Sequence, residues 1–223
     1  MDMLARRLQA FMEGMMERAD PQVVRVMAAA AAELERRGVT HNAPKPGQMA
    51  PDFTLPDQTG QPVHLRALLE RGPVVVKFIR GGWCPFCTLT LRAVNDVQPD
   101  LAREGAALVA ISPQTPEMTR QTAERNMLRF PLLSDRGNEV ATAYGLTWTL
   151  SPEVQEVYRK LGHDLPRING TPDWTLPIPA GFLIRTDGTI AKSHVDVQVT
   201  HRMEPSAAVE AVRALRTPAL ADG

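Results

Sequence analysis

The first 39 residues place apolar side chains at helical spacing and predict two helices joined by a short turn. Asp20 followed by Pro21 is typical of a helix N-cap and first turn, and Gly38 is typical of a helix stop. We therefore expect a helical hairpin over residues 1–39. Its apolar faces consist of Leu4, Leu8, Phe11 and Met15 on one helix, and Val23, Met27, Ala30 and Leu34 on the other.

After a Pro- and Gly-rich entry at 41–51, short apolar runs alternate with helical patterns. The run PVVVKFI at 73–79 is typical of a central strand buried on both faces, and residues 84–105 predict the helix that follows it. Further strands are expected at 52–55, 62–65, 106–112 and 130–135, and further helices at 115–128 and 137–146.

Residues 145–178 interrupt this alternation, with one helix expected at about 152–161 inside long loop material. A connection of this length is often functional. Trp148 and Trp174 therefore belong either to a lid over a nearby site or to a structural flap that fills the edge of the core.

The last part of the chain predicts a hairpin over 181–195 and a closing helix over 204–215, capped by Glu204. Strands and helices in this order are typical of an α/β thioredoxin-like fold, with a mixed central sheet covered by helices on both faces. We expect the hairpin 1–39 and a thioredoxin-like domain over 40–223 that carries the insertion.

Composition excludes several classes of protein. Hydrophobic residues make up 43% of the 223 residues, and the formal net charge is zero, so a broad nucleic-acid footprint is not expected. No apolar run approaches the roughly 18 residues of a membrane span, and the N-terminus lacks the pattern of a secretory signal. We therefore expect a cytoplasmic protein with no nucleic-acid or membrane partner. The methionines of the hairpin serve either packing on its own domain or a homodimer contact.

Cys84 and Cys87 are the only cysteines, and they lie where a buried strand gives way to a helix. The unpaired N–H groups and positive dipole end of a helix favour a thiolate over a thiol. Their spacing places both sulfurs on one side of the first turn, where they can close a disulfide. Pro85 fits the first helical position, and Trp83 and Phe86 would give the site an apolar rim.

Two other interpretations of this pair are weaker. A zinc site commonly needs four ligands, and the sequence offers no second cysteine pair, so we expect no metal and no cofactor. Two inert cysteines would also be buried, but spacing, position and proline together favour a redox pair. Arg80 either stabilises a thiolate or holds a peroxide oxygen, or it is a solvated loop charge. His163 and His194 are expected to be ordinary hydrogen-bonding residues.

Four stretches carry a family resemblance: PGQMAPDFTLPDQTGQPVHL, VVVKFIRGGWCPFC, FPLLSDRGNEVATAYGL and IPAGFLIRTDGTIAKSHVD. Together they resemble the alkyl hydroperoxide reductase/thiol-specific antioxidant family, the peroxiredoxins, in a branch with a CxxC motif. The resemblance implies a thiol peroxidase for hydrogen peroxide or organic hydroperoxides. It also implies a cysteine sulfenic acid, a Cys84–Cys87 disulfide, and a thioredoxin- or glutathione-type reductant.

The family motif Pro-x-x-x-Thr/Ser-x-x-Cys places Cys87 at the peroxidatic position. Cys84 replaces its threonine, Arg80 replaces its proline, and Pro179 stands where the family has an arginine. WCPFC also resembles thioredoxin-like disulfide oxidoreductases, in which Cys84 would be the nucleophile and Pro179 a facing cis-proline. The order of attack, and the choice between a peroxide and a disulfide substrate, stay open. A redox sensor or interaction protein without turnover is the third hypothesis.

Overall fold

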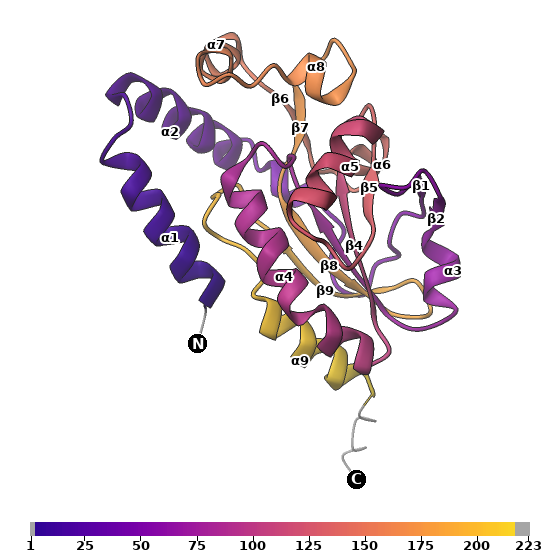
Figure 1. Ribbon diagram of the computed structural model, residues 1–223. Coiled ribbons are helices and arrows are strands. Elements are labelled where there is room, and N and C mark those ends of the chain that lie inside the picture. The colour runs from indigo at the N-terminus through magenta and orange to yellow at the C-terminus, as the bar shows by residue number, and fades with distance from the viewer. Residues whose placement is uncertain (1–2, 217–223) are drawn as a thin grey trace.

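The computed structural model describes residues 3–216, which fold around a five-stranded sheet (Figure 1). Its strands are β3 (Val74–Phe78), β4 (Ala107–Ser112), β5 (Leu132–Ser134), β8 (Ala180–Ile184) and β9 (Ile190–Val195). β3, β4 and β5 are parallel, whereas β8 runs antiparallel to both β3 and β9. The order β5-β4-β3-β8-β9 confirms the expected thioredoxin-like fold with a mixed sheet.

Helices cover both faces of this sheet. One face carries α4 (Pro85–Arg103), α5 (Pro116–Arg125) and α9 (Pro205–Arg216), and the other carries α3 (Leu65–Leu69) and α6 (Glu139–Ala143). Side chains alternate along a strand, so Val75 of β3 faces α4 while Val76 faces the opposite core. Every residue of β3 is buried, as its apolar run predicts.

Smaller elements precede the sheet. The strands β1 (Thr54–Pro56) and β2 (Pro62–His64) pair antiparallel, where two short strands are expected. A short 3-10 helix, η1 (Val39–Asn42), follows the N-terminal helices. Within residues 3–216, no helix combines the length and the apolar character needed to cross a bilayer.

The two N-terminal helices form where the sequence predicts them, but each packs on a different part of the molecule. α1 (Met3–Met16) lies along α4, and α2 (Pro21–Arg36) lies against α7 (Pro152–Lys160) of the insertion (Figure 1). The helices therefore open as a V instead of packing along each other. Burial of an apolar face against a core is the main source of stability for a helix in a protein. Here α1 contacts the core beneath α4, and α2 contacts the core of the insertion. The division of the chain at residue 39 stays a prediction.

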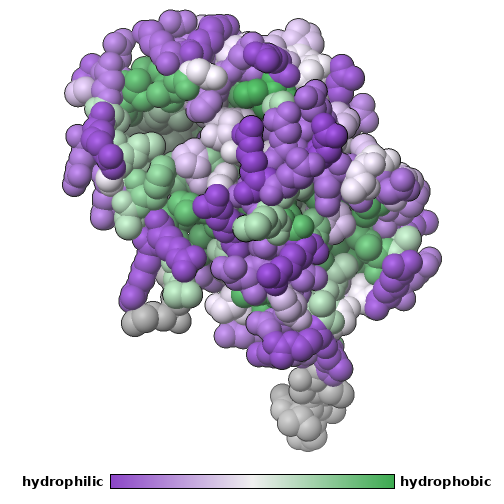
Figure 2. Space-filling model, viewed as in Figure 1, coloured by the Kyte–Doolittle hydropathy of each residue, from purple (hydrophilic) through white to green (hydrophobic). Residues whose placement is uncertain are grey.

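The apolar face of α1 is only partly covered. Leu4 and Leu8 are fully buried, whereas Phe11 and Met15, which continue the same face, each keep 38% exposure. Figure 2 shows apolar surface gathered over the part of the molecule formed by the N-terminal helices. The expected packing of this segment on its own domain is confirmed for Leu4 and Leu8. A homodimer contact through the remaining face stays a prediction.

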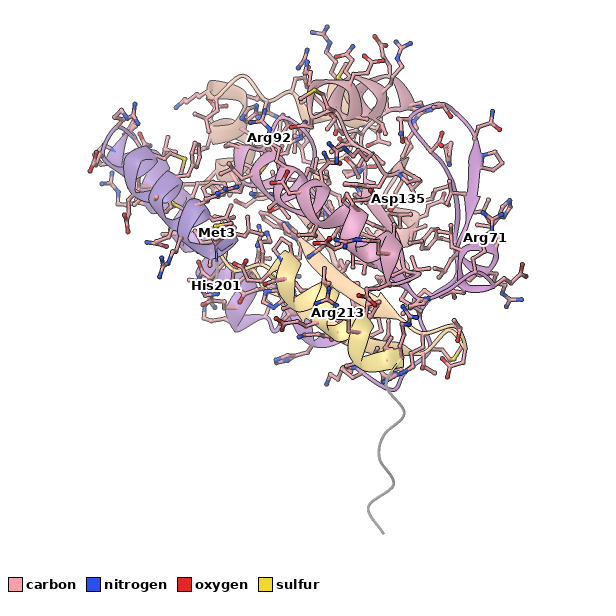
Figure 3. All side chains as sticks on the ribbon, turned by 60° about the horizontal axis from the view of Figure 1, so that its bottom comes forward. Met3, Arg71, Arg92, Asp135, His201 and Arg213 are labelled. Atoms are coloured by element: carbon pink, nitrogen blue, oxygen red, sulfur yellow. The ribbon has the colours of Figure 1, made fainter. Side chains whose placement is uncertain are left out.

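Glu204 precedes α9, but its carboxylate caps a different helix. It accepts hydrogen bonds from the backbone N–H groups of Leu4 (3.1 Å) and Ala5 (2.7 Å) in the first turn of α1. The expectation that its side chain caps the closing helix is therefore wrong, because the exposed N–H groups of α1 attract the carboxylate. Figure 3 shows the start of α1, at Met3, beside His201 in the segment that leads to α9.

The insertion contains more regular structure than its sequence predicts. The expected helix forms as α7, and a second helix, α8 (Leu165–Asn169), follows it. β6 (Thr147–Thr149) and β7 (Thr175–Pro177) pair antiparallel and join the insertion to the sheet. Its own core consists of Leu150, Val154, Val157, Tyr158, Leu165 and Leu176. The insertion is a small folded unit, so its side chains have fixed positions.

Candidate redox site

The cysteine pair lies at the N-terminus of α4, directly after β3. Cys84 is the N-cap residue of this helix and Pro85 is its first residue, which confirms the expected strand-to-helix position. Both cysteines are reduced, and they keep only 2% and 1% exposure. The helix dipole and the unpaired N–H groups of the first turn favour a negative charge at this point.

Arg80 is buried beside the pair, with 7% exposure. Its Nη2 donates to Sγ of Cys84 over 3.1 Å, so the interpretation of Arg80 as a solvated loop charge is wrong. Among residues 3–216 no carboxylate pairs with this guanidinium. Burial opposes the charge of Arg80, but the neighbouring Cys84 raises the pKa of Arg80 above its usual value. The guanidinium and the sulfur therefore form a buried pair of opposite charges.

The two thiols have opposite pKa shifts. Burial opposes ionisation of Cys84, but the hydrogen bond from the Cys87 thiol and the charge of Arg80 hold the pKa of Cys84 well below its usual value. The pKa of Cys87 is raised well above its usual value, first because its thiol donates to Cys84, then because it is buried and next to a negative sulfur. One sulfur is thus a thiolate while the other keeps its proton.

Side chains of the insertion cover the pair. The ring centroid of Trp83 lies 5.4 Å from that of Tyr158 and 4.8 Å from that of His163. Trp148 and Trp174, expected either in a lid or in a structural flap, both pack on the core of the insertion. Burial lowers the pKa of His163, so this ring is neutral near pH 7. The part of the insertion next to the site is therefore the end of α7.

Helix α1 covers the other side. The ring of Phe11 meets the ring of Phe86 edge to face, with 5.2 Å between their centroids. Phe86 is buried with both cysteines in one core cluster, so the expected apolar rim is part of the packed core on this side of the site. Because both sulfurs are buried, a substrate reaches them only after side chains of α1 or of the insertion move.

The two glycines before Trp83 allow close packing of the loop. Gly81 has a φ of +145°, and a Cβ there would lie 2.5 Å from Nε1 of Trp83. A Cβ on Gly82 would lie 2.3 Å from Oγ1 of Thr122. The N–H of Gly82 donates to Oε1 of Gln114 over 2.9 Å, which fixes the loop to the end of β4.

Pro179 differs from the expectation. No peptide bond within residues 3–216 is cis, so the cis-proline expectation is wrong. The N–H of Ile178 donates to the carbonyl of Leu146 over 2.7 Å, and this extended segment leads directly into β8. The ordinary trans bond suits that path. A direct role of Pro179 opposite Cys84 stays a prediction.

Two site residues, Arg202 and Tyr158, were not expected from the sequence, and a buried lysine, Lys77, lies in the strand before the site. Arg202 is half-buried close to both cysteines; desolvation lowers its pKa to about 10, and its Nη2 has no hydrogen-bond partner. Tyr158 accepts a hydrogen bond from Nη1 of Arg80 over 3.3 Å. Lys77 donates to the carbonyl of Met203 over 3.2 Å, and burial lowers the pKa of Lys77 to about 7. Of these three residues, only Lys77 could have been identified from the sequence, because it is the single charge in an apolar strand.

The remaining candidates do not build a metal site. Within residues 3–216, His, Cys, Asp and Glu form no group of three that could hold an ion. His194 lies in β9 opposite Gly181, and burial together with the charge of Lys77 lowers its pKa. The chemistry available at the site is that of two sulfurs beside a buried guanidinium.

Comparisons with known proteins agree with this geometry. A model of the AhpC/TSA family matches residues 46–193. A putative peroxiredoxin of Mycobacterium tuberculosis is 36% identical over 115 residues, which cover 52% of this chain and 75% of that protein. Peroxiredoxin Bcp of Escherichia coli is 34% identical over 105 residues, which cover 47% of this chain and 67% of Bcp.

A solved structure has a similar fold. Peroxidoxin BcpB from Mycobacterium tuberculosis superposes with a TM-score of 0.63 at 28% identity, covering 78% of this chain and 99% of that one. The range matched by the family model includes the cysteine pair and the insertion, but neither α1 nor α2.

Proposed function

This chain belongs to the AhpC/TSA family, the peroxiredoxins, and from that premise we propose that it is a thiol peroxidase whose reaction starts at Cys84 and is resolved by Cys87. The observation that carries the proposal is the contact of 3.1 Å between Nη2 of Arg80 and Sγ of Cys84. A thiolate is the nucleophilic form of cysteine, and this is the sulfur beside a buried cation.

The proposed reaction has two steps on the protein. The Cys84 thiolate attacks one peroxide oxygen, the O–O bond breaks, and the second oxygen leaves as hydroxide or alkoxide and takes up a proton. Cys84 is then a sulfenic acid, and the Cys87 thiol condenses with it to form the disulfide and water. A thioredoxin- or glutathione-type reductant restores the Cys84–Cys87 dithiol by thiol–disulfide exchange.

Family alignment favours the opposite order, since Cys87 falls on the peroxidatic position. The electrostatics around the pair support Cys84 instead, because Cys87 keeps the shared proton. In this order Cys84 takes the place of the family's threonine, and its sulfur is the one that the cation activates.

The test is single-turnover reduction of peroxide by the full chain carrying Cys84→Ser or Cys87→Ser. We expect Cys87→Ser to consume one equivalent of peroxide and to hold a sulfenic acid at Cys84, which a sulfenic-acid reagent traps. Cys84→Ser should lose the fast phase. Fast turnover in Cys84→Ser alone would instead identify Cys87 as the nucleophile, and no peroxide consumption by the wild type would refute peroxidase activity.

A second function, thiol–disulfide exchange on a protein or small disulfide, is favoured by the same thiolate. A low-pKa first cysteine of a CxxC motif also suits attack on disulfide sulfur. Mixed disulfides that accumulate in Cys87→Ser and are absent in Cys84→Ser would support it. Failure to reduce insulin disulfides would count against it. The reductant, a homodimer and a cytoplasmic location stay predictions.

A further inference from the structure

The insertion contributes a hydrogen-bonding atom to the site, the hydroxyl oxygen of Tyr158. It accepts a hydrogen bond from Nη1 of Arg80 over 3.3 Å, while Nη2 of the same guanidinium donates to Cys84 over 3.1 Å. Tyr158 is buried, and burial raises its pKa, so the phenol is neutral near pH 7. The oxygen thus acts as a neutral acceptor for a cation.

Arg80 has few other partners. Its Nε is buried without a hydrogen-bond partner, and no carboxylate pairs with the guanidinium among residues 3–216. A guanidinium is planar, so two bonds at its two terminal nitrogens fix both its position and its plane. One bond goes to Cys84 and the other goes to Tyr158, so loss of the Tyr158 bond leaves the guanidinium with a single hydrogen bond, to the sulfur, beside its contact with the ring of Trp83 at 6.0 Å.

Tyr158 itself has a fixed position. It lies in α7, where Ser151 caps the helix and Val154 and Val157 pack in the core of the insertion. Its ring also contacts Trp83, the residue before Cys84. Helix α7 of the insertion, and not the central sheet, therefore holds this hydroxyl in a fixed position next to Arg80.

We propose that Tyr158 is a positioning residue, which holds Arg80 in place to stabilise the Cys84 thiolate. It acts through Arg80 and does not itself react. The inference rests on the proposed role of Cys84 as the thiolate. The insertion would then do more than bury the site, because one of its side chains would orient the guanidinium next to the reacting sulfur.

The test compares Tyr158→Phe with Tyr144→Phe in the full chain, each combined with Cys87→Ser so that one thiol titrates. Phenylalanine removes only the hydroxyl. Tyr144 is a matched control, since its hydroxyl is also buried but has no hydrogen-bond partner and lies in the core cluster on the opposite face of the sheet. The thiolate is followed by its ultraviolet absorbance during a pH titration. The titratable groups around Cys84 are Arg80, Cys87, Tyr158, His163 and Arg202.

We expect Tyr158→Phe to raise the Cys84 pKa by about one unit, a tenfold change in its ionisation constant, while Tyr144→Phe leaves it unchanged. The reaction rate with peroxide near neutral pH should fall in parallel, and raising the pH should restore it. An unchanged titration in Tyr158→Phe overturns the proposal, even if the protein melts at a lower temperature. An ordinary Cys84 pKa already in the Cys87→Ser parent also overturns it, and the peroxide assay then decides separately whether the protein is a peroxidase.

Discussion

The Nη2 atom of Arg80 and the Sγ atom of Cys84 lie 3.1 Å apart, and both residues are buried. In such a site the attraction between a cation and a thiolate is screened far less than at the surface. The reactivity of the pair and the stability of each redox state should therefore depend on this one contact.

Replacing Arg80 with methionine should slow peroxide reduction about tenfold or more at neutral pH, because the Cys84 pKa returns toward that of an ordinary thiol. Arg80→Lys should lie in between, since it keeps the charge but loses the planar fork. The measurement is the pH profile of single-turnover peroxide consumption. Equal profiles in Arg80→Met and the wild type would contradict the assigned role.

Oxidation should destabilise the fold. The disulfide removes the thiolate that neutralises Arg80, and an unpaired buried charge is costly. A loop as short as that between Cys84 and Cys87 offers little entropic stabilisation in return. We expect the oxidised protein to melt at a lower temperature than the reduced one, and Arg80→Met to remove the difference. A higher melting temperature for the oxidised wild type would refute this.

Lys77 should make stability depend on pH. Burial lowers its pKa from 10.5 to about 7, so between these values the unfolded chain binds a proton that the folded chain has released. By linkage, stability rises as pH increases through this window and falls as pH drops to about 7. Urea unfolding at several pH values should show a smaller rise in Lys77→Met than in the wild type. Lys192→Met, an exposed lysine of β9, is the matched control and should keep the wild-type rise.

Glu204 should hold α1 on the molecule. Glu204→Gln removes the charge that faces the first turn of α1 and should cost about 1 kcal/mol of unfolding free energy. Glu17→Gln, just beyond the other end of the same helix, is the control, because the helix dipole there disfavours a negative charge. Urea unfolding of both variants checks the opposite signs, and equal effects would contradict the capping role.

Local patterns in the sequence predict the sheet strands, α4 and the CxxC position, because each depends on a continuous run of residues. They do not predict β6 and β7, which are short strands that meet only after a long excursion of the chain. The partners of α1 and α2 are missed for a related reason. An amphipathic pattern indicates which face of a helix is buried, but not what it is buried against.

The same limit applies to the site. Cys84, Cys87 and Arg80 lie within one short segment, so their proximity is readable from the sequence. Tyr158 and Arg202 come from α7 and from the segment before α9, and only the folded chain brings them beside the sulfurs. Glu204 has the residue type of a cap, but the helix it caps is set by tertiary packing.

Trp83 directly precedes Cys84, and its indole lies against Tyr158 and His163. Indole emission depends on the charge and oxidation state of a neighbouring sulfur, so the emission of Trp83 should change when Cys84 passes from a thiolate to a disulfide. The intrinsic fluorescence of the protein would then follow its redox state without an attached dye, and a Trp83→Phe variant would lose that response.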